Sequence, residues 1–186
     1  MEQLEDYSGE FRLDLKLQDF SKDALVRLWH AAAKMYVGLD GLYYSWARKK
    51  WGEQLAAELD AEMWRRAAYL DVRRARETMN IHGDDVATLF KVYQCDAGLA
   101  GKMDAEYELK DKNHGVLTAR RCRSLEYYER HGETMLQKNV CEVIDVQGFR
   151  NTARLINPNI RVTPLKLPPR KSKDEIACQW EFKIEE

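Results

Sequence analysis

The stretch that decides the fold is Ile176-Ala177-Cys178-Gln179-Trp180-Glu181-Phe182-Lys183-Ile184. Apolar and polar side chains alternate along it, with Ala177 the one small residue among the polar positions. Because successive side chains of a strand point to opposite faces, Cys178, Trp180 and Phe182 share one face. The stretch therefore predicts a half-buried β-strand.

Three further segments predict its partners in a sheet. Residues 160–167 are extended, and Pro164 favours a sheet edge because proline cannot donate to the hydrogen-bond ladder. Residues 105–110 and 116–122 also alternate, and the turn at 112–115 joins them into a hairpin. An isolated hairpin is marginally stable, so we expect both pairs to join one antiparallel sheet.

The remaining segments predict helices and one more strand. Residues 124–130 and 142–156 form helices between the strands, and upstream helices begin after Asp19 or Ser21, after Gly52 and after Asp84 or Asp85. Residues 10–17 alternate and predict an edge strand, whereas Gly98 and Gly101 indicate a connection. The apolar stripe of the second helix is Leu59, Met63, Ala67 and Leu70.

The first helix carries an apolar stripe at a spacing of three or four residues. Its members are Leu25, Leu28, Ala32, Tyr36, Leu39, Tyr43 and Trp46. Gly38 and Gly41 either kink this helix or break it in two, since each glycine costs ~1 kcal/mol against alanine. Asp40 lies between them, either as a solvated residue of an Asp-Gly turn or as a pocket carboxylate.

These elements predict an α+β fold, with N-terminal helices covering an antiparallel sheet formed mainly by the C-terminal third. The length of 186 residues favours one domain, residues 1–186. Residues 1–102 make its mainly helical half, and residues 103–186 make a sheet-and-helix half that contains three cysteines.

Composition excludes several functional classes. With 45% hydrophobic and 33% charged residues, the chain is typical of a globular protein, and its net charge of −1 argues against nucleic-acid or membrane partners. We find no signal peptide and no run of the ~18 apolar residues that a membrane helix needs, so we expect a cytoplasmic protein. The sequence contains no phosphate-binding glycine loop, and we expect no nucleotide cofactor.

Cysteine chemistry is the main candidate for a reactive site. Cys122 ends a predicted strand, Cys141 begins the long helix, and Cys178 lies on the last strand, so the three can meet at one end of the sheet. One interpretation is a zinc site, with Glu126 as a fourth ligand or a general base. The alternatives are thiols that pack as small hydrophobic groups, and a surface position for Glu126.

The chain also resembles a known group of proteins. It resembles a family of uncharacterised prokaryotic cytosolic proteins in several short motifs. These are Arg121-Cys122, Leu125-Glu126, Val140-Cys141, Phe149, Ile156-Asn157-Pro158, Pro168-Pro169 and Cys178-Gln179-Trp180-Glu181-Phe182. Leu39-Asp40-Gly41-Leu42 and Trp64 match the same family. That family is similar to L-2-amino-thiazoline-4-carboxylate hydrolases and, more distantly, to 4-vinyl-reductase-like ligand-binding domains. The distant resemblance implies a helix-and-sheet domain around an apolar cavity, sometimes with cysteine-bound zinc.

Three functional hypotheses follow. The first is a small-ligand-binding domain with Asp40 as its polar anchor and with a pocket lined by Tyr36, Tyr43, Tyr44 and Trp46. In this hypothesis Cys122, Cys141 and Cys178 either hold zinc or pack as thiols. The second is a hydrolase that opens a small ring containing sulfur or nitrogen, by a thiolate or a metal-bound water. The third is a homodimeric interaction module without small-molecule chemistry.

Overall fold

The computed structural model describes residues 3–184 and confirms the predicted α+β class. Its main helices are α1 (Lys22–Trp51), α2 (Glu53–Met79), α3 (Val86–Gln94), α4 (Ala97–Lys102), α5 (Arg123–His131), α6 (Thr134–Lys138) and α7 (Asp145–Ile156). A 3-10 turn (Leu17–Asp19) precedes α1, and a π-helical segment (Asn139–Ile144) joins α6 to α7. The strands are β1 (Met103–Asp111), β2 (His114–Cys122), β3 (Ile160–Lys166) and β4 (Cys178–Ile184).

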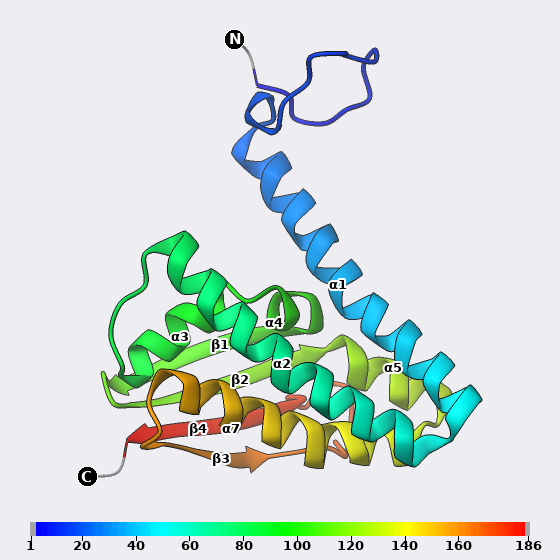
Figure 1. The fold of residues 1–186 in the computed structure, drawn as a ribbon, viewed down its shortest axis with the longest axis vertical. Coiled ribbons are helices and arrows are strands. Elements are labelled where there is room, and N and C mark those ends of the chain that lie inside the picture. Colours follow the sequence, from blue (N-terminus) through cyan, green and yellow to red (C-terminus); the bar gives the residue numbers. More distant parts are fainter. Residues whose placement is uncertain (1–2, 185–186) are drawn as a thin grey trace.

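The four strands form one antiparallel sheet in the order β1-β2-β4-β3, as the two predicted pairs required. The helices α2, α3 and α7 lie in front of the sheet in Figure 1. Leu117 of β2 lies opposite both Tyr107 and Trp180, so these three side chains share the face that the helices cover. The predicted alternation of the last strand is confirmed, because Cys178, Trp180 and Phe182 are all buried.

Aromatic rings fill the space between helices and sheet. Phe182 makes edge-to-face contacts with Phe90 of α3 at 5.4 Å and with Tyr93 at 5.8 Å between ring centroids. Phe149 of α7 completes the cluster, 4.6 Å from Trp180. Such pairs contribute about 0.5–1.5 kcal/mol each beyond the burial of their area. Val72 of α2 belongs to the same buried core, so α2 packs directly over this cluster.

Helix α1 is continuous, so the prediction of a break at Gly38 and Gly41 is wrong, and so is the solvated Asp-Gly turn at Asp40. Packing against α4 outweighs the cost of two glycines within a helix. A β-carbon added to Gly101 of α4 would lie 2.1 Å from the carbonyl oxygen of Ala33, so the two backbones are in direct contact. This contact fixes the middle of α1 over the domain.

The apolar stripes predicted for α1 and α2 are only partly buried: most of the α1 stripe and half of the α2 stripe are exposed. On α1, Leu39 is 58% exposed and Trp46 is 66% exposed, while Ala33, Tyr44 and Ala47 are buried. On α2, Leu59 and Met63 are more than a third exposed, and the buried positions include Ala56, Asp60 and Val72. Small and polar residues face the core here because the helices approach closely.

The predicted edge strand at residues 10–17 is wrong. Phe11 is 79% exposed and Leu13 is 95% exposed, and the segment is irregular up to the 3-10 turn. Leu4 instead forms a parallel bridge with Phe20. Figure 1 shows this segment at the free tip of α1, far from the sheet that a strand would need to join.

Two other local differences place residues of the candidate site. The predicted connection at Gly98 and Gly101 is the short helix α4, which begins where the Asp96 side chain accepts a hydrogen bond from the Leu99 amide at 2.8 Å. The predicted helix from residue 142 begins as the π-helical segment. Its wider turn changes the direction of the side chains that precede α7.

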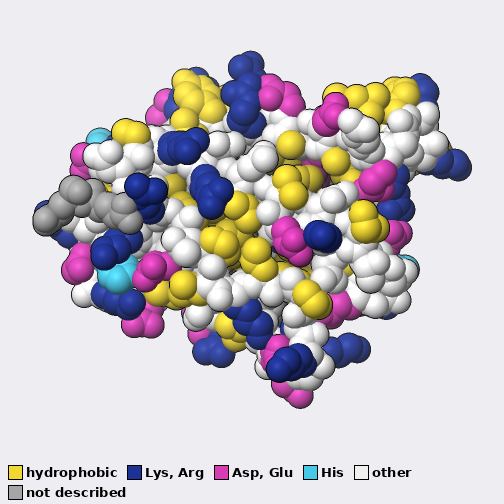
Figure 2. All heavy atoms as spheres, turned by 90° about the horizontal axis from the view of Figure 1, so that it is seen from below, with side chains coloured by type: hydrophobic (Ala, Val, Ile, Leu, Met, Phe, Trp, Pro, Cys, Tyr) yellow, Lys and Arg dark blue, Asp and Glu magenta, His cyan; other side chains and the backbone are white. Residues whose placement is uncertain are grey.

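The surface carries mixed charge. On the face in Figure 2, Lys and Arg side chains are interspersed with Asp and Glu, and hydrophobic side chains gather near the middle. None of the helices within residues 3–184 combines the length and the apolar character needed to cross a bilayer.

Candidate functional site

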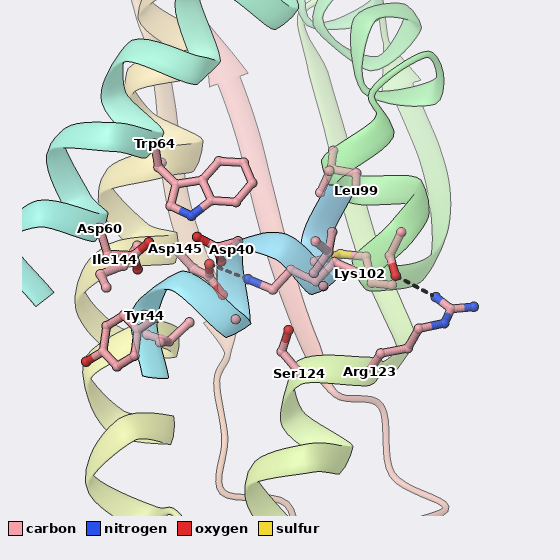
Figure 3. A pocket seen from close by; sticks show the side chains of 18 of the residues that line it. Asp40, Tyr44, Asp60, Trp64, Leu99, Lys102, Arg123, Ser124, Ile144 and Asp145 are labelled. Atoms are coloured by element: carbon pink, nitrogen blue, oxygen red, sulfur yellow. Dashed lines mark hydrogen bonds and ion pairs between the residues drawn. The ribbon is translucent and has the colours of Figure 1, made fainter. Parts of the chain in front are cut away.

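A cavity of about 560 Å³ lies between α1, α2, α4 and α7. Small-molecule pockets usually measure about 300–1,000 Å³, so this one has the size for a ligand. Leu99, Val140, Ile144 and Phe149 contribute apolar side chains to its wall. Three acidic side chains and one lysine of the wall converge at one corner (Figure 3), while Asp71, Asp96 and Arg123 also line the cavity.

Asp40 of α1 and Asp60 of α2 form the centre of this polar group. Asp60 is only 6% exposed, and both residues line the cavity. The Oδ1 atoms of both aspartates are buried without a hydrogen-bond partner among the described residues. An unsatisfied buried polar atom costs about 1–3 kcal/mol, so this pair destabilises the folded state.

The two carboxyl groups change each other's ionisation. Burial raises the pKa of Asp60 to about 8, and the charge of Asp40 adds to this effect. Burial also raises the pKa of Asp40. Hydrogen bonds with Asp60 and with the Trp64 indole, together with the positive charge of Lys102, oppose this rise. Two carboxyl groups at one buried site cannot both ionise easily, so the pair retains one proton at neutral pH.

A buried ion pair stands next to the two aspartates. The Lys102 Nζ atom lies 2.5 Å from Asp145 Oδ1, and each side chain is 18% exposed. Burial alone would lower the pKa of Lys102, but Asp145 and nearby groups raise it above its ordinary value. Lys102 is therefore charged, and Asp145 is its direct partner.

Local sequence explains how these groups come together. Gly101 lets α4 approach α1, and Lys102 follows at the end of α4. Asp145 begins α7 immediately after the π-helical segment. Trp64 lies one helical turn after Asp60 and makes an edge contact with Tyr36 at 5.8 Å between ring centroids. Four helices thus each supply one charged group to the same corner.

Two of the aromatic and acidic residues predicted to bind a ligand line the cavity, namely Asp40 and Tyr44. The Tyr44 hydroxyl donates a hydrogen bond to Glu53 Oε1 at 2.6 Å. Tyr36 lies behind the wall, where its hydroxyl donates to Asp71 Oδ2 at 3.1 Å.

The structure places the remaining candidate residues, Tyr43, Trp46 and Glu126, outside the cavity. Tyr43 and Trp46 are more than half exposed, because the buried face of α1 is centred on Ala33, Asp40 and Tyr44. Glu126 accepts a hydrogen bond from the Arg121 guanidinium at 2.9 Å on the surface of α5. Its carboxylate is thus occupied by a neighbouring cation.

The three cysteines meet, as their sequence positions predicted, around a second cavity of only about 10 Å³. Burial raises the pKa of Cys122 and Cys141, and it raises that of Cys178 to about 12. The Trp180 indole donates a hydrogen bond to the Cys178 sulfur at 3.2 Å. These thiols are neutral at physiological pH and pack with the core.

In the described part of the chain, the structure shows no arrangement of side chains that supports the predicted zinc site. Tetrahedral zinc needs three or four converging ligands, with sulfur present as thiolate. Within residues 3–184 no group of three or more His, Cys, Asp or Glu side chains is arranged to hold a metal ion. The arrangement of the sulfurs therefore gives no support to the zinc prediction.

Sequence reasoning missed three of the four charged groups at the main cavity. Asp60, Lys102 and Asp145 each resemble ordinary surface charges in a chain that is 33% charged. One signal was present: Asp60 lies one turn from Ala56 and from Trp64, so its nearest neighbours on that face are uncharged. The π-helical segment that directs Asp145 has no comparable sequence signal.

Comparison with known families now identifies the group to which this chain is related. The model of a family of unknown function (DUF6125) matches residues 18–184. The chain belongs to the DUF6125 family. This membership confirms the prediction of an uncharacterised family. The matched range includes all four helices that supply charged groups to the cavity, so the DUF6125 region contains the candidate site. No curated protein and no solved structure matches the chain.

Proposed function

We propose that this protein binds a small organic molecule in the cavity between α1, α2, α4 and α7. The observation that carries the proposal is the cavity itself, at about 560 Å³ with a mainly apolar wall and a corner where charged groups converge. This combination is the usual composition of small-molecule sites, in which a few polar groups orient a largely apolar ligand. Asp40 is the polar anchor predicted from the sequence, and Asp60 joins it.

A neutral fluorescent probe tests this function without reference to charge. We expect N-phenyl-1-naphthylamine to bind with a large rise in fluorescence, because the apolar wall excludes water. Gly148→Phe should weaken binding by about tenfold or more. Gly148 lines the cavity, and a side chain added there meets nothing within 4 Å, so the new ring has room to occupy the ligand space.

Gly9→Phe is the matched control, since Gly9 is equally open but lies outside the cavity. Circular dichroism would show that both variants are folded. Equal probe binding by the parent protein, G148F and G9F would refute the cavity as a ligand site.

A second candidate function is a homodimeric module, favoured by the exposed apolar face of α1. Leu28, Met35, Leu39, Leu42, Tyr43 and Trp46 are each about half exposed or more. Together they present on the order of 600 Å², which is at or above the largest patch of a typical monomer. A second copy is the favoured partner because stable dimers bury about 800 Å² per subunit, and a net charge of −1 opposes self-association little.

Light scattering after size exclusion tests the dimer. We expect the mass of two chains, and we expect Leu39→Glu combined with Trp46→Glu to give the mass of one chain, because it places charges in the stripe. Glu108→Lys changes an exposed charge on β1 and should leave the dimer intact. A parent protein with the mass of one chain at micromolar concentration would remove this candidate.

Hydrolysis of a thiazoline-type ring, implied by the hydrolase resemblance, stays a prediction. The buried, neutral thiols do not favour a thiolate nucleophile, because only the thiolate attacks.

A further inference from the structure

We propose that the ligand of the cavity is an organic cation, with one protonated amine and an apolar body, whose ammonium group binds between Asp40 and Asp60. This inference rests on the proposed function and adds the chemical class of the ligand. It starts from geometry. The Oδ1 atoms of both aspartates are buried, lie at the wall of the cavity and have no hydrogen-bond partner among residues 3–184.

The corner that contains Asp40 and Asp60 has more carboxyl groups than cations. Three carboxyl groups, those of Asp40, Asp60 and Asp145, face a single ammonium group, that of Lys102. Asp145 is already paired with Lys102 at 2.5 Å. The remaining two carboxyl groups therefore need a cation or a proton, and a ligand ammonium supplies both positive charge and hydrogen-bond donors.

The surroundings of the pair favour an organic cation. The Trp64 ring lies beside Asp40 with its indole nitrogen turned toward that carboxyl group (Figure 3), so its carbon atoms add apolar surface next to the pair. Leu99 and Ile144 line the adjoining wall and suit an apolar body. A metal ion is disfavoured, because no group of acidic, histidine or cysteine side chains in residues 3–184 is arranged to hold one.

Ligand and proton compete for the same place. The charged or titratable groups that face Asp60 are Asp40 from α1, Tyr44 from α1, Lys102 from α4 and Asp145 from α7. In the free protein the pair keeps a proton at neutral pH, and an arriving ammonium group releases it. Affinity for an amine should therefore rise as pH increases toward about 8, by close to tenfold per pH unit, and then level off.

Three probes with the same apolar body and different charge test the inference. They are 4-phenylbutylamine, 4-phenylbutanol and 4-phenylbutanoate, titrated by calorimetry into the full chain. We expect the amine to bind at least about tenfold more tightly than the alcohol, and the carboxylate to bind most weakly. Two buffers of different ionisation enthalpy should reveal release of about one proton per bound amine near pH 7.

Variants of the pair separate a binding role from a structural one. Asp60→Asn and Asp40→Asn should each remove the preference for the amine and the proton release, while the alcohol still binds. Asp60→Asn should also raise the melting temperature at pH 8, because it removes a carboxyl group that is costly to ionise in the fold. Glu126→Gln removes the same charge at the surface and should retain the preference.

The outcomes distinguish the two proposals. Equal binding of amine and alcohol, or a preference that persists in D60N and D40N, would overturn the cationic ligand and leave the binding cavity in place. Failure of all three probes at millimolar concentration, together with failure of the neutral naphthylamine, would overturn both.

Discussion

Lys102→Met is expected to destabilise the protein by about 3–5 kcal/mol at neutral pH, because it leaves Asp145 without its cation in a buried corner. Asp40 and Asp60 lie in the same corner, so the loss of Lys102 removes the positive charge that offsets three carboxyl groups. The free energy of unfolding from urea denaturation measures the effect. Adding Asp145→Leu to K102M should restore most of the stability, since an apolar pair often replaces a buried ion pair without loss.

Lys166→Met is the control for this experiment. Lys166 also pairs with a carboxylate at 2.8 Å, that of Glu175, but both side chains are about a third exposed. A pair in that position contributes about 0–1 kcal/mol, so K166M should change little. If K102M and K166M lower the free energy of unfolding by the same amount, the charge of Lys102 does not stabilise the buried carboxyl groups around it.

Gly101→Ala is expected to cost about 3 kcal/mol, because its methyl group has no space. A β-carbon at Gly101 would lie 2.1 Å from the carbonyl oxygen and 2.6 Å from the carbonyl carbon of Ala33. These are backbone atoms of α1 and cannot rotate away as a side chain would. The two helices must separate, which also displaces Asp40 from Asp60. Thermal and urea denaturation measure the loss.

Gly41→Ala is the matched substitution on α1. An added β-carbon at Gly41 meets nothing within 4 Å, so alanine should stabilise the helix by up to about 1 kcal/mol. A G101A variant as stable as the parent would show that α1 and α4 are not held at the close distance on which the cavity depends.

Sequence periodicity predicted the sheet well because each strand carries its own signal. The alternation around Trp180 and the turn before Gly115 define strands without reference to distant residues. The helices were harder, because periodicity shows which residues share a face but not which face meets the core. On α1, the largest apolar stripe faces outward, and Gly101 of α4 selects the small residue Ala33 for the inside.

The candidate site was predictable only in part. Asp40 stood out from the sequence because it lies among apolar and aromatic residues. Asp60 reaches Asp40 only because α2 folds back along α1, which the sequence does not indicate. Lys102 and Asp145 likewise reach the cavity only because α4 and α7 enclose it. The strand expected at residues 10–17 failed because alternation alone does not provide a neighbouring strand.

The free N-terminal tip of α1 affects how the chain unfolds locally. Residues 3–20 make their hydrogen bonds and ring contacts with one another and with the first turns of α1, and the body begins to hold the helix near Ala33. Segments with few buried contacts exchange their amide protons through local fluctuations that leave the rest of a protein folded. We therefore expect residues 3–20 and the first turns of α1 to fray locally, while Asp40, Asp60 and the cavity around them stay folded.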